Sequence, residues 1–294
     1  MSHPQSDSYT EATLLCRRRE TMRRTRDVLL PAVVLLAGCH GTLEPAQPPV
    51  DAVGTNLAYV YEAIDTLFGE HVTAERGLVD YDAVYADPLL QRVRDSIATF
   101  DLSSVESPAD SLALLINAYN IAVIYHLRDY GFDPTANNFA LFNSLDIVVA
   151  GQYLTLDELE KTSPSHIKGF DEPRTHFALV CAALSCPPLM NRAYRGDSLW
   201  VQLDRRTTAF LNDSEFTRID PASGSVQVSR LFQWYANDFA GFVRDTTRPE
   251  LLAPKAGGTV ADFVASYITD PAKAAAVRAN SLQFLPYDWT VNRQ

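Results

Sequence analysis

The chain is poor in positive charge, in cysteine and in long apolar runs. Its 25 lysine and arginine residues face 36 aspartate and glutamate residues, and the net charge of −11 argues against nucleic acid as a partner. None of its four cysteines forms a CxxC pair, which argues against a thioredoxin-type redox site. The apolar run from Val28 to Ala37 is shorter than the roughly 20 residues of a membrane-spanning helix. No internal repeat or second linker is present, so one domain is the simplest organisation.

The N-terminal region has the layout of an export signal. From Met22 the sequence reads MRRTRDVLLPAVVLLAGC, in which a basic start precedes the apolar run and small residues lead to Cys39. This order is typical of a secretory signal peptide, and the closing LAGC resembles a bacterial lipobox, whose cysteine becomes the acylated first residue of the mature protein. An internal core helix would need a longer periodic segment. We therefore expect residues 1–38 to be an N-terminal extension with a lipoprotein signal peptide, and Cys39 to be lipidated.

The remaining chain is expected to form a tether and one domain. Residues 39–54 are rich in proline and small residues and predict a flexible linker, whereas residues 55–294 suffice for one globular domain. Without residues 1–38, 19 basic residues face 32 acidic ones, a net charge of −13. This acidity disfavours docking on anionic lipid, so we expect membrane attachment through acyl chains on Cys39. The predicted location is the cell envelope, with the domain facing the periplasm or the exterior.

Apolar periodicity predicts more helices than strands. Segment 108–126 is apolar nearly all round, which predicts a helix buried within the domain, with Ser107 as its cap. The run from Thr155 to Glu158 fits a capping box and predicts a short helix over 156–162. Other predicted elements are helices at 55–71, 197–211, 259–268 and 271–279, and hairpins at 145–156 and 216–229. We predict a single α+β domain with several helices packed on a small, mainly antiparallel sheet; a papain- or transglutaminase-like arrangement is one architecture of this class.

Two amides interrupt the apolar helix predicted at 108–126. Asn117 and Asn120 are three residues apart and therefore lie on one face. A buried amide without hydrogen bonds costs about 1–3 kcal/mol, so both need partners. Either they tie neighbouring loops to the helix, or they line a pocket and orient a substrate carbonyl or a catalytic imidazole.

The segment HFALVCAALSCPP, residues 176–188, holds one histidine and two of the four cysteines. The composition of HFALV predicts a buried strand, in which His176 and Cys181 would point to opposite faces. Their direct pairing would therefore require a break in the strand before Cys181. A nucleophilic thiolate needs a base or a positive environment nearby. The candidate bases are His176, His126 and His166.

Other interpretations of the two cysteines stay open at this point. An oxidising envelope allows a disulfide between Cys181 and Cys186. A zinc site made of His176 and both cysteines lacks a clear fourth ligand, and its CxxxxC spacing is looser than usual. Inert burial of a small thiol is also common in protein cores.

Five segments taken together resemble the domain-of-unknown-function family 547 (DUF547). They occur in the family's order, span about residues 55–292, and are GLVDY (77–81), LLINAYNIAVI (114–124), HFALVCAALSCPPL (176–189), VSRLFQWYANDF (228–239) and FLPYDWTVN (284–292). Bacterial members are often exported proteins or lipoproteins, which agrees with the predicted leader. The resemblance implies a type of domain but no established reaction.

The resemblance also singles out positions of this chain. They are Asn117, Tyr119 and Asn120, then His176, Cys181, Cys186 and Pro187, then Asp238, Asp288 and Trp289. The family pattern in plant relatives keeps a cysteine matching Cys181 but not one matching Cys186, which favours Cys181 as the special residue. Many bacterial members carry Glu-His in the preceding helix, where this chain has Glu160 followed by Lys161. One possible imidazole is therefore missing here.

The leading hypothesis is a lipid-anchored, cysteine-dependent hydrolase or acyltransferase acting on an amide or peptide-like small molecule. Cys181 would be the nucleophile and His176 its base, with Glu160 supporting the histidine. Asn117 or Asn120 would orient the imidazole or donate to an oxyanion. No cofactor and no bound metal are implied. The alternatives are a non-catalytic envelope binding module with a Cys181–Cys186 disulfide and, third, a zinc-dependent enzyme.

Overall fold

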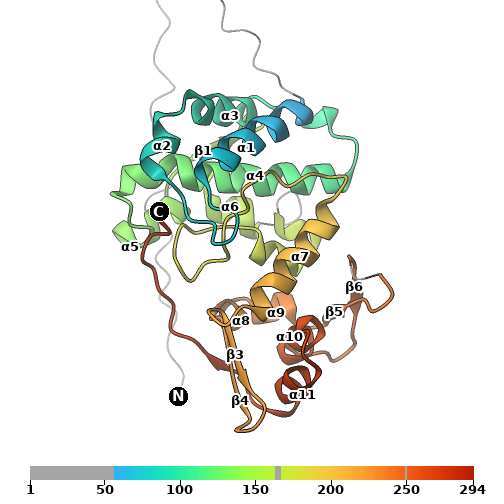
Figure 1. Ribbon diagram of the computed structural model, residues 1–294. Coiled ribbons are helices and arrows are strands. Elements are labelled where there is room, and N and C mark those ends of the chain that lie inside the picture. The colour runs from blue at the N-terminus through green and yellow to red at the C-terminus, as the bar shows by residue number, and fades with distance from the viewer. Residues whose placement is uncertain (1–55, 163–166, 249) are drawn as a thin grey trace, which may run out of the picture. The chain divides into compact units, whose positions relative to one another are not determined.

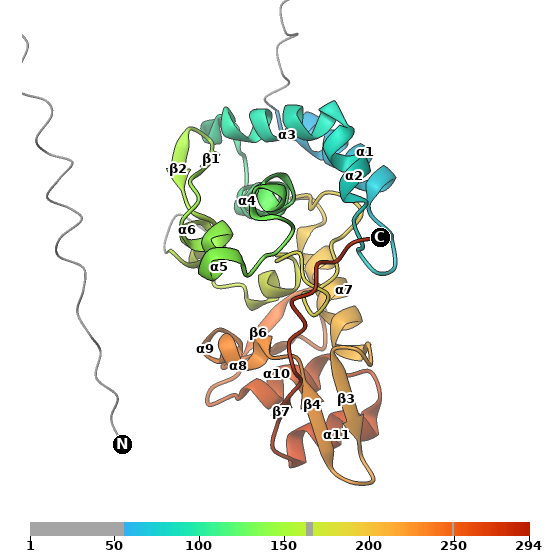
Figure 2. The ribbon, with the colours of Figure 1, turned by 90° about the vertical axis from the view of Figure 1, so that its left-hand side faces the viewer.

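Helix α4 (Pro108–His126) forms the centre of the first of two hydrophobic clusters in the computed structural model, which describes residues 56–162, 167–248 and 250–294. Its sequence explains both its start and its place. Ser107 caps the helix by accepting a hydrogen bond from the N–H of Asp110, and proline occupies the first turn. Every residue from Leu112 to Ile124 is buried, and Figure 2 shows the helix end-on within a ring of other elements. The predicted buried helix is confirmed.

The elements around α4 supply the rest of the first cluster. Helix α3 packs against both α1 and α4, and the β1–β2 hairpin turns at Ala150 and Gly151, which have φ angles of 49° and 76°. The bounds are α1 (Leu57–His71), α2 (Tyr81–Ala86), α3 (Pro88–Ala98), α5 (Ala136–Asn143), β1 (Ile147–Val149), β2 (Gln152–Leu154) and α6 (Leu156–Lys161), with short 3-10 helices η3 (Leu102–Ser104), η4 (Leu127–Tyr130) and η5 (Ile167–Phe170).

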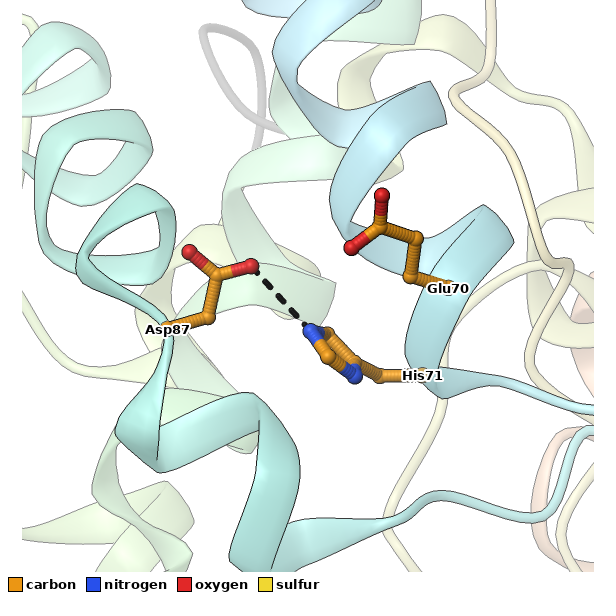
Figure 3. Close-up of side chains that lie close together, drawn as sticks. All are labelled: Glu70, His71 and Asp87. Carbon is orange, nitrogen blue, oxygen red and sulfur yellow. Dashed lines mark hydrogen bonds and ion pairs between the residues drawn. The ribbon is translucent and has the colours of Figure 1, made fainter.

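An imidazole–carboxylate pair joins the end of α1 to the start of α3 (Figure 3). His71 closes α1, and its Nε2 lies 3.1 Å from Oδ2 of Asp87. Asp87 is also the cap of α3, because its other carboxylate oxygen accepts the N–H of Leu89 at 2.7 Å. The pair therefore holds two helix ends together.

The second cluster is built around aromatic rings, and its elements occupy the lower part of Figure 1. Phe177, Phe232, Phe239 and Phe263 are each at most 1% exposed and lie within ring contact of one another. The bounds are η6 (Pro173–Phe177), α7 (Leu199–Asn212), β3 (Thr217–Asp220), β4 (Ser225–Val228), α8 (Leu231–Trp234), α9 (Ala236–Phe239), β5 (Phe242–Arg244), β6 (Leu252–Pro254), α10 (Val260–Tyr267), α11 (Pro271–Ala279) and β7 (Gln283–Phe284).

The sheets are small and separate. Strands β3 and β4 pair antiparallel, with Thr217 opposite Val228 and Asp220 opposite Ser225, and β7 adds to β4 in parallel. The hairpins β1–β2 and β5–β6 form two further two-stranded sheets. In the part of the chain that the structure describes, helices dominate over these strands, so the predicted α+β class is confirmed.

The strand predicted for HFALV is wrong. Residues Pro173–Phe177 form the 3-10 helix η6, which Glu172 caps through the N–H of Arg174. The N–H groups of Ala178 and Leu179 then donate to the carbonyl of Thr175, at 2.8 and 3.0 Å. A local turn and contacts with α4 thus satisfy this backbone, and they override the β propensity of the side chains. The opposite-face argument for His176 and Cys181 therefore does not apply.

The C-terminal tail returns from the second cluster to the first (Figures 1 and 2). The N–H of Leu285 donates to Val228, whereas the N–H of Asn292 donates to Ala182, both at 2.9 Å. Between these points, the N–H groups of Leu184 and Ser185 donate to tail carbonyls. This pairing places residues 287–289 alongside the cysteine segment.

No helix among the described residues is long and apolar enough to cross a membrane. The predicted signal peptide (1–38), the lipidation site Cys39 and the predicted linker (39–54) lie outside the described residues.

Candidate active site

Helix α4 positions Cys181 through a buried amide. The side chain of Asn120 accepts a hydrogen bond from the N–H of Val180 at 3.0 Å and donates to the carbonyl of Ala178 at 2.9 Å. Directly after the cysteine, Ala182 has a φ of 60°, so the chain turns sharply there. Asn120 therefore fixes the backbone that leads into Cys181, and both ends of its amide are occupied.

Asn117, one turn earlier on α4, is used at a different loop. Its amide donates to the carbonyl of Tyr194 at 2.8 Å and accepts the N–H of the same residue at 2.9 Å. It does not line the cavities that Cys181 lines. Both asparagines thus tie loops to the helix, which is the first of the two roles that the sequence left open; neither side chain points its polar atoms at the imidazole.

The Cys181 sulfur contacts a hydroxyl group from the C-terminal tail. The hydroxyl of Tyr287, on the C-terminal tail, is 3.1 Å from the sulfur. Burial on its own raises the pKa of Cys181, and the charge of Glu160 raises it further. Hydrogen bonding with Cys186, the Tyr287 hydroxyl and the backbone of Ala183 lowers this pKa by more, so the net pKa lies below the usual value. A thiolate at Cys181 is therefore stabilised by neutral groups.

Cys186 has the opposite character. It is 6% exposed, and its sulfur accepts the N–H of Cys181 at 2.8 Å. Burial first, and then the hydrogen bond to Cys181, raise the pKa of Cys186 well above its usual value. Both thiols are free in the structure, in contrast to the disulfide alternative. Cys186 thus keeps its proton, and its thiol donates to the carbonyl of Leu179 at 3.9 Å.

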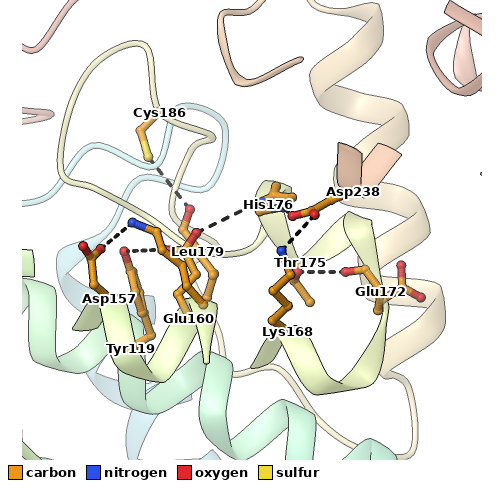
Figure 4. A network of polar contacts seen from close by, with 11 residues as sticks. Tyr119, Asp157, Glu160, Lys168, Glu172, Thr175, His176, Leu179, Cys186 and Asp238 are labelled. Atoms are coloured by element: carbon orange, nitrogen blue, oxygen red, sulfur yellow. Dashed lines mark hydrogen bonds and ion pairs between the residues drawn. The ribbon is translucent and has the colours of Figure 1, made fainter. Parts of the chain in front are cut away.

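His176, in η6, is held by Asp238 (Figure 4) and by the ring of Tyr235. Its Nε2 lies 3.0 Å from Oδ2 of Asp238, on α9, and its ring packs on Tyr235 with centroids 3.9 Å apart. The hydrogen bond with His176 is the largest influence on the pKa of Asp238 and lowers it against burial, with help from Lys168. Nδ1 points the other way, 3.9 Å from Oε1 of Glu160. Asp238 therefore remains a carboxylate that fixes the ring and leaves Nδ1 available.

Glu160 joins the histidine to a buried tyrosine. It lies on α6, where the predicted capping box of Thr155 and Glu158 is present, and it is 8% exposed. The hydroxyl of Tyr119 donates to Oε2 of Glu160 at 3.3 Å. Burial first, and then the charge of Glu160, raise the pKa of Tyr119 well above its usual value, so this hydroxyl keeps its proton.

Three neighbouring cavities meet at this site. A small one of about 80 Å³ is lined by both Cys181 and His176. A second, of about 410 Å³, is lined by Cys181 but not by His176, and a third, of about 500 Å³, is lined by His176 but not by Cys181. Glu160, Trp234 and Tyr235 border all three. The thiol and the imidazole thus border the same small cavity, and each also borders one of the two larger cavities.

The other histidines proposed as bases are not part of this arrangement. His126 pairs with Asp129, with 3.2 Å between Nδ1 and Oδ2, and lines none of the three cavities. His166 lies outside the described residues.

The zinc alternative is not formed in the structure. Among residues 56–162, 167–248 and 250–294, the one group of three His, Cys, Asp or Glu side chains that could hold a metal ion is Glu70, His71 and Asp87. His176, Cys181 and Cys186 do not form such a group.

Sequence reasoning missed the partners that reach the site from far along the chain. Asp238 and Tyr287 lie 62 and 106 residues from the side chains that they contact. Asp238 was among the positions singled out by the family resemblance, but nothing local indicated that it faces the histidine. Tyr235 occupies the break between α8 and α9.

The model of the family described as "Protein of unknown function, DUF547" matches residues 103–211. This match supports the DUF547 family. The matched DUF547 region contains α4, α6 and both cysteines, whereas Asp238 and Tyr287 lie beyond it. No curated protein and no solved structure matches the chain.

Proposed function

We propose that the protein is a cysteine-dependent hydrolase or acyltransferase that acts on amide or peptide-like substrates. The observation that carries the proposal is the shared cavity of about 80 Å³, which a thiol of lowered pKa and an imidazole held by a carboxylate both line. A nucleophile, a base and a group that orients the base are the parts that thiol acyl transfer requires.

The proposed reaction uses the two nitrogens of the His176 imidazole in different ways. The Cys181 thiolate attacks the amide carbonyl carbon, a sulfur–carbon bond forms, and the carbon–nitrogen bond breaks as His176 gives a proton to the departing amine. Water or an acceptor amine then attacks the thioester, giving up its proton to His176 and releasing Cys181. Asp238 holds Nε2 throughout, so the proton is carried at Nδ1.

Two measurements on the purified domain test the proposal. The rate of alkylation of Cys181 by iodoacetamide, followed between about pH 5 and pH 9, is expected to have a midpoint below that of N-acetylcysteine. Treatment with p-nitrophenyl acetate is expected to release a burst of p-nitrophenolate and to leave an acetyl group on Cys181, located by mass spectrometry of peptides. An ordinary alkylation midpoint together with no burst would sink the proposal and leave the binding-module alternative.

We also propose that a lipid on Cys39 anchors the domain to the cell envelope. Support comes from the basic start, apolar run and LAGC of residues 22–39. Growth of an expressing bacterium with an alkyne-tagged fatty acid should label the full chain but not its Cys39→Ala variant. Label retained by Cys39→Ala, or absent from both, contradicts the anchor without bearing on Cys181.

A further inference from the structure

The cavity on the thiol side has an aromatic wall. Six of its eleven lining residues are aromatic: Tyr119, Phe139, Phe142, Trp234, Tyr235 and Trp289. Trp289 contacts two other rings of this wall, with its ring centroid 5.0 Å from that of Phe139 and 6.0 Å from that of Trp234. Trp234, at the rim, is 46% exposed. Rings of this kind offer apolar area that a ligand's hydrophobic group can cover.

The cavity on the imidazole side is charged instead. Six of its twelve lining residues carry charge: Glu160, Lys161, Lys168, Asp171, Glu172 and Asp238. Carboxylates thus outnumber ammonium groups by four to two in this lining. Among them, Asp171 is exposed and lines neither of the other two cavities. Glu172 is paired with Arg174, and Asp238 with Lys168 and His176, whereas Asp171 forms no ion pair with the described residues, so it is the carboxylate that can attract a positively charged ligand group.

Acyl transfer assigns one part of the substrate to each cavity. The acyl carbon must bond to sulfur, so the acyl group lies where Cys181 points; the amine nitrogen takes its proton from His176, so the leaving group lies where the imidazole points. Cys181 lines the aromatic cavity and His176 does not, whereas His176 lines the charged cavity and Cys181 does not. Building on the proposed function, we propose that the substrate is an amide of an apolar or aromatic acyl group with a cationic amine, such as a basic amino acid or short basic peptide.

The acyl side is tested with two esters that share a leaving group. The burst rates with p-nitrophenyl phenylacetate and p-nitrophenyl acetate are measured, and their ratio is divided by the ratio for N-acetylcysteine. We expect this corrected ratio to be about tenfold in favour of phenylacetate, which corresponds to about 1.4 kcal/mol, because the aromatic wall partly covers the phenyl ring. Phe139→Ala should lower it towards unity, and Phe139→Leu should keep most of it. Trp234→Ala, at an exposed rim position, serves as a second variant if Phe139→Ala fails to fold.

The amine side is tested by competition for the phenylacetyl-enzyme. Lysine amide and norleucine amide have side chains of similar length, and only the former carries a terminal ammonium. We expect lysine amide to capture the acyl group about two- to fivefold more often, since one partly exposed charge contributes roughly 0.2–1 kcal/mol. Asp171→Asn should reduce this preference without changing the corrected ester ratio. Phe139→Ala should do the reverse.

The outcomes separate this substrate assignment from the function on which it rests. If neither ester acylates Cys181, the proposed function itself is wrong. If both esters acylate Cys181 but the corrected ratio is unity, or Phe139→Ala and Trp234→Ala leave it unchanged, the apolar acyl assignment is overturned while the thiol chemistry stands. Equal capture of lysine amide and norleucine amide overturns the cationic amine assignment.

Discussion

His71 and His176 form nearly identical pairs with carboxylates, yet they lie in different surroundings (Figures 3 and 4). The distances from Nε2 to the aspartate oxygen are 3.1 Å to Asp87 and 3.0 Å to Asp238, and each histidine has a glutamate nearby. Asp87 is used to cap a helix, and no thiol belongs to its group. His176 shares a cavity with Cys181.

The comparison teaches that an imidazole–carboxylate pair is not by itself a site. At α1 and α3 the pair contributes to holding two helix ends together. At α9 the same contact orients a ring whose other nitrogen lies 3.9 Å from Glu160, beside a cavity that the Cys181 thiol also lines. What distinguishes the two is the cavity and the thiol, so the sharpest tests change both pairs in matched ways and measure reactivity and stability separately.

Removal of the thiol should give the largest difference. We expect Cys181→Ala to abolish the p-nitrophenyl acetate burst, a loss on the order of 10³-fold or more, because the other thiol that lines the small cavity, Cys186, has a raised pKa and stays protonated. His71→Ala is the matched control and should retain the burst. The measurement is stopped-flow absorbance with peptide mass spectrometry. A burst that survives in Cys181→Ala would show that the reactive group lies elsewhere.

Neutralising the two aspartates should give the next largest difference. Asp238→Asn keeps the shape of the side chain but removes the charge that orients His176, so we expect the acylation rate to fall by roughly 10²-fold or more. Asp87→Asn makes the same change at His71 and should leave the rate unchanged. Equal rates in the two variants would place Asp238 in a purely structural role.

Loss of the Tyr287 hydroxyl should move the titration of Cys181. Tyr287→Phe removes a donor to the thiolate, and a hydrogen bond to a charged group contributes roughly 1.5–3 kcal/mol, so we expect the pKa of Cys181 to rise by about one unit or more. Alkylation needs the thiolate; its midpoint should therefore move to higher pH by the same amount. Tyr153→Phe is the matched control, because it makes the same deletion on the exposed strand β2, lines none of the three cavities and should leave the midpoint in place.

Local signals in the sequence predicted much of the fold. The capping residues Ser107 and Thr155 predicted the helices α4 and α6, and the turn at Ala150-Gly151 predicted the β1–β2 hairpin. These predictions were possible because caps and turns act within a few residues. HFALV was predicted wrongly as a strand, because Thr175 and Asn120 offer its backbone other partners. Propensity cannot include a hydrogen bond from a helix about 60 residues away.

The candidate site was predicted only in part for the same reason. Cys181, His176 and Glu160 are near one another along the chain, and all three line the small cavity. Asp238 and Tyr287 come from a helix and a tail that the second cluster and the returning C-terminus bring into place. The chemistry of the thiol depends on these later residues, so sequence position alone could not give its lowered pKa.

The free energy of unfolding should show the smallest difference between the two pairs. The direction of its change with pH follows from the pKa shifts of the two aspartates. Burial raises the pKa of Asp87, but the N–H of Leu89 and the His71 ring outweigh it, and the hydrogen bond from His176 lowers the pKa of Asp238; both folded values lie below the usual one. An aspartate of lowered pKa stabilises the fold above its unfolded pKa, and this contribution is lost as the pH falls through the folded pKa. We therefore expect Asp87→Asn and Asp238→Asn each to lower the free energy of unfolding near pH 7 by no more than about 1 kcal/mol, since both pairs are partly screened by solvent. Near pH 2 the variants and the parent chain should unfold alike in urea. We thus expect the two variants to lose equal amounts of unfolding free energy at every pH. A large loss confined to Asp238→Asn would mean that its effect on acylation reports unfolding rather than the orientation of His176.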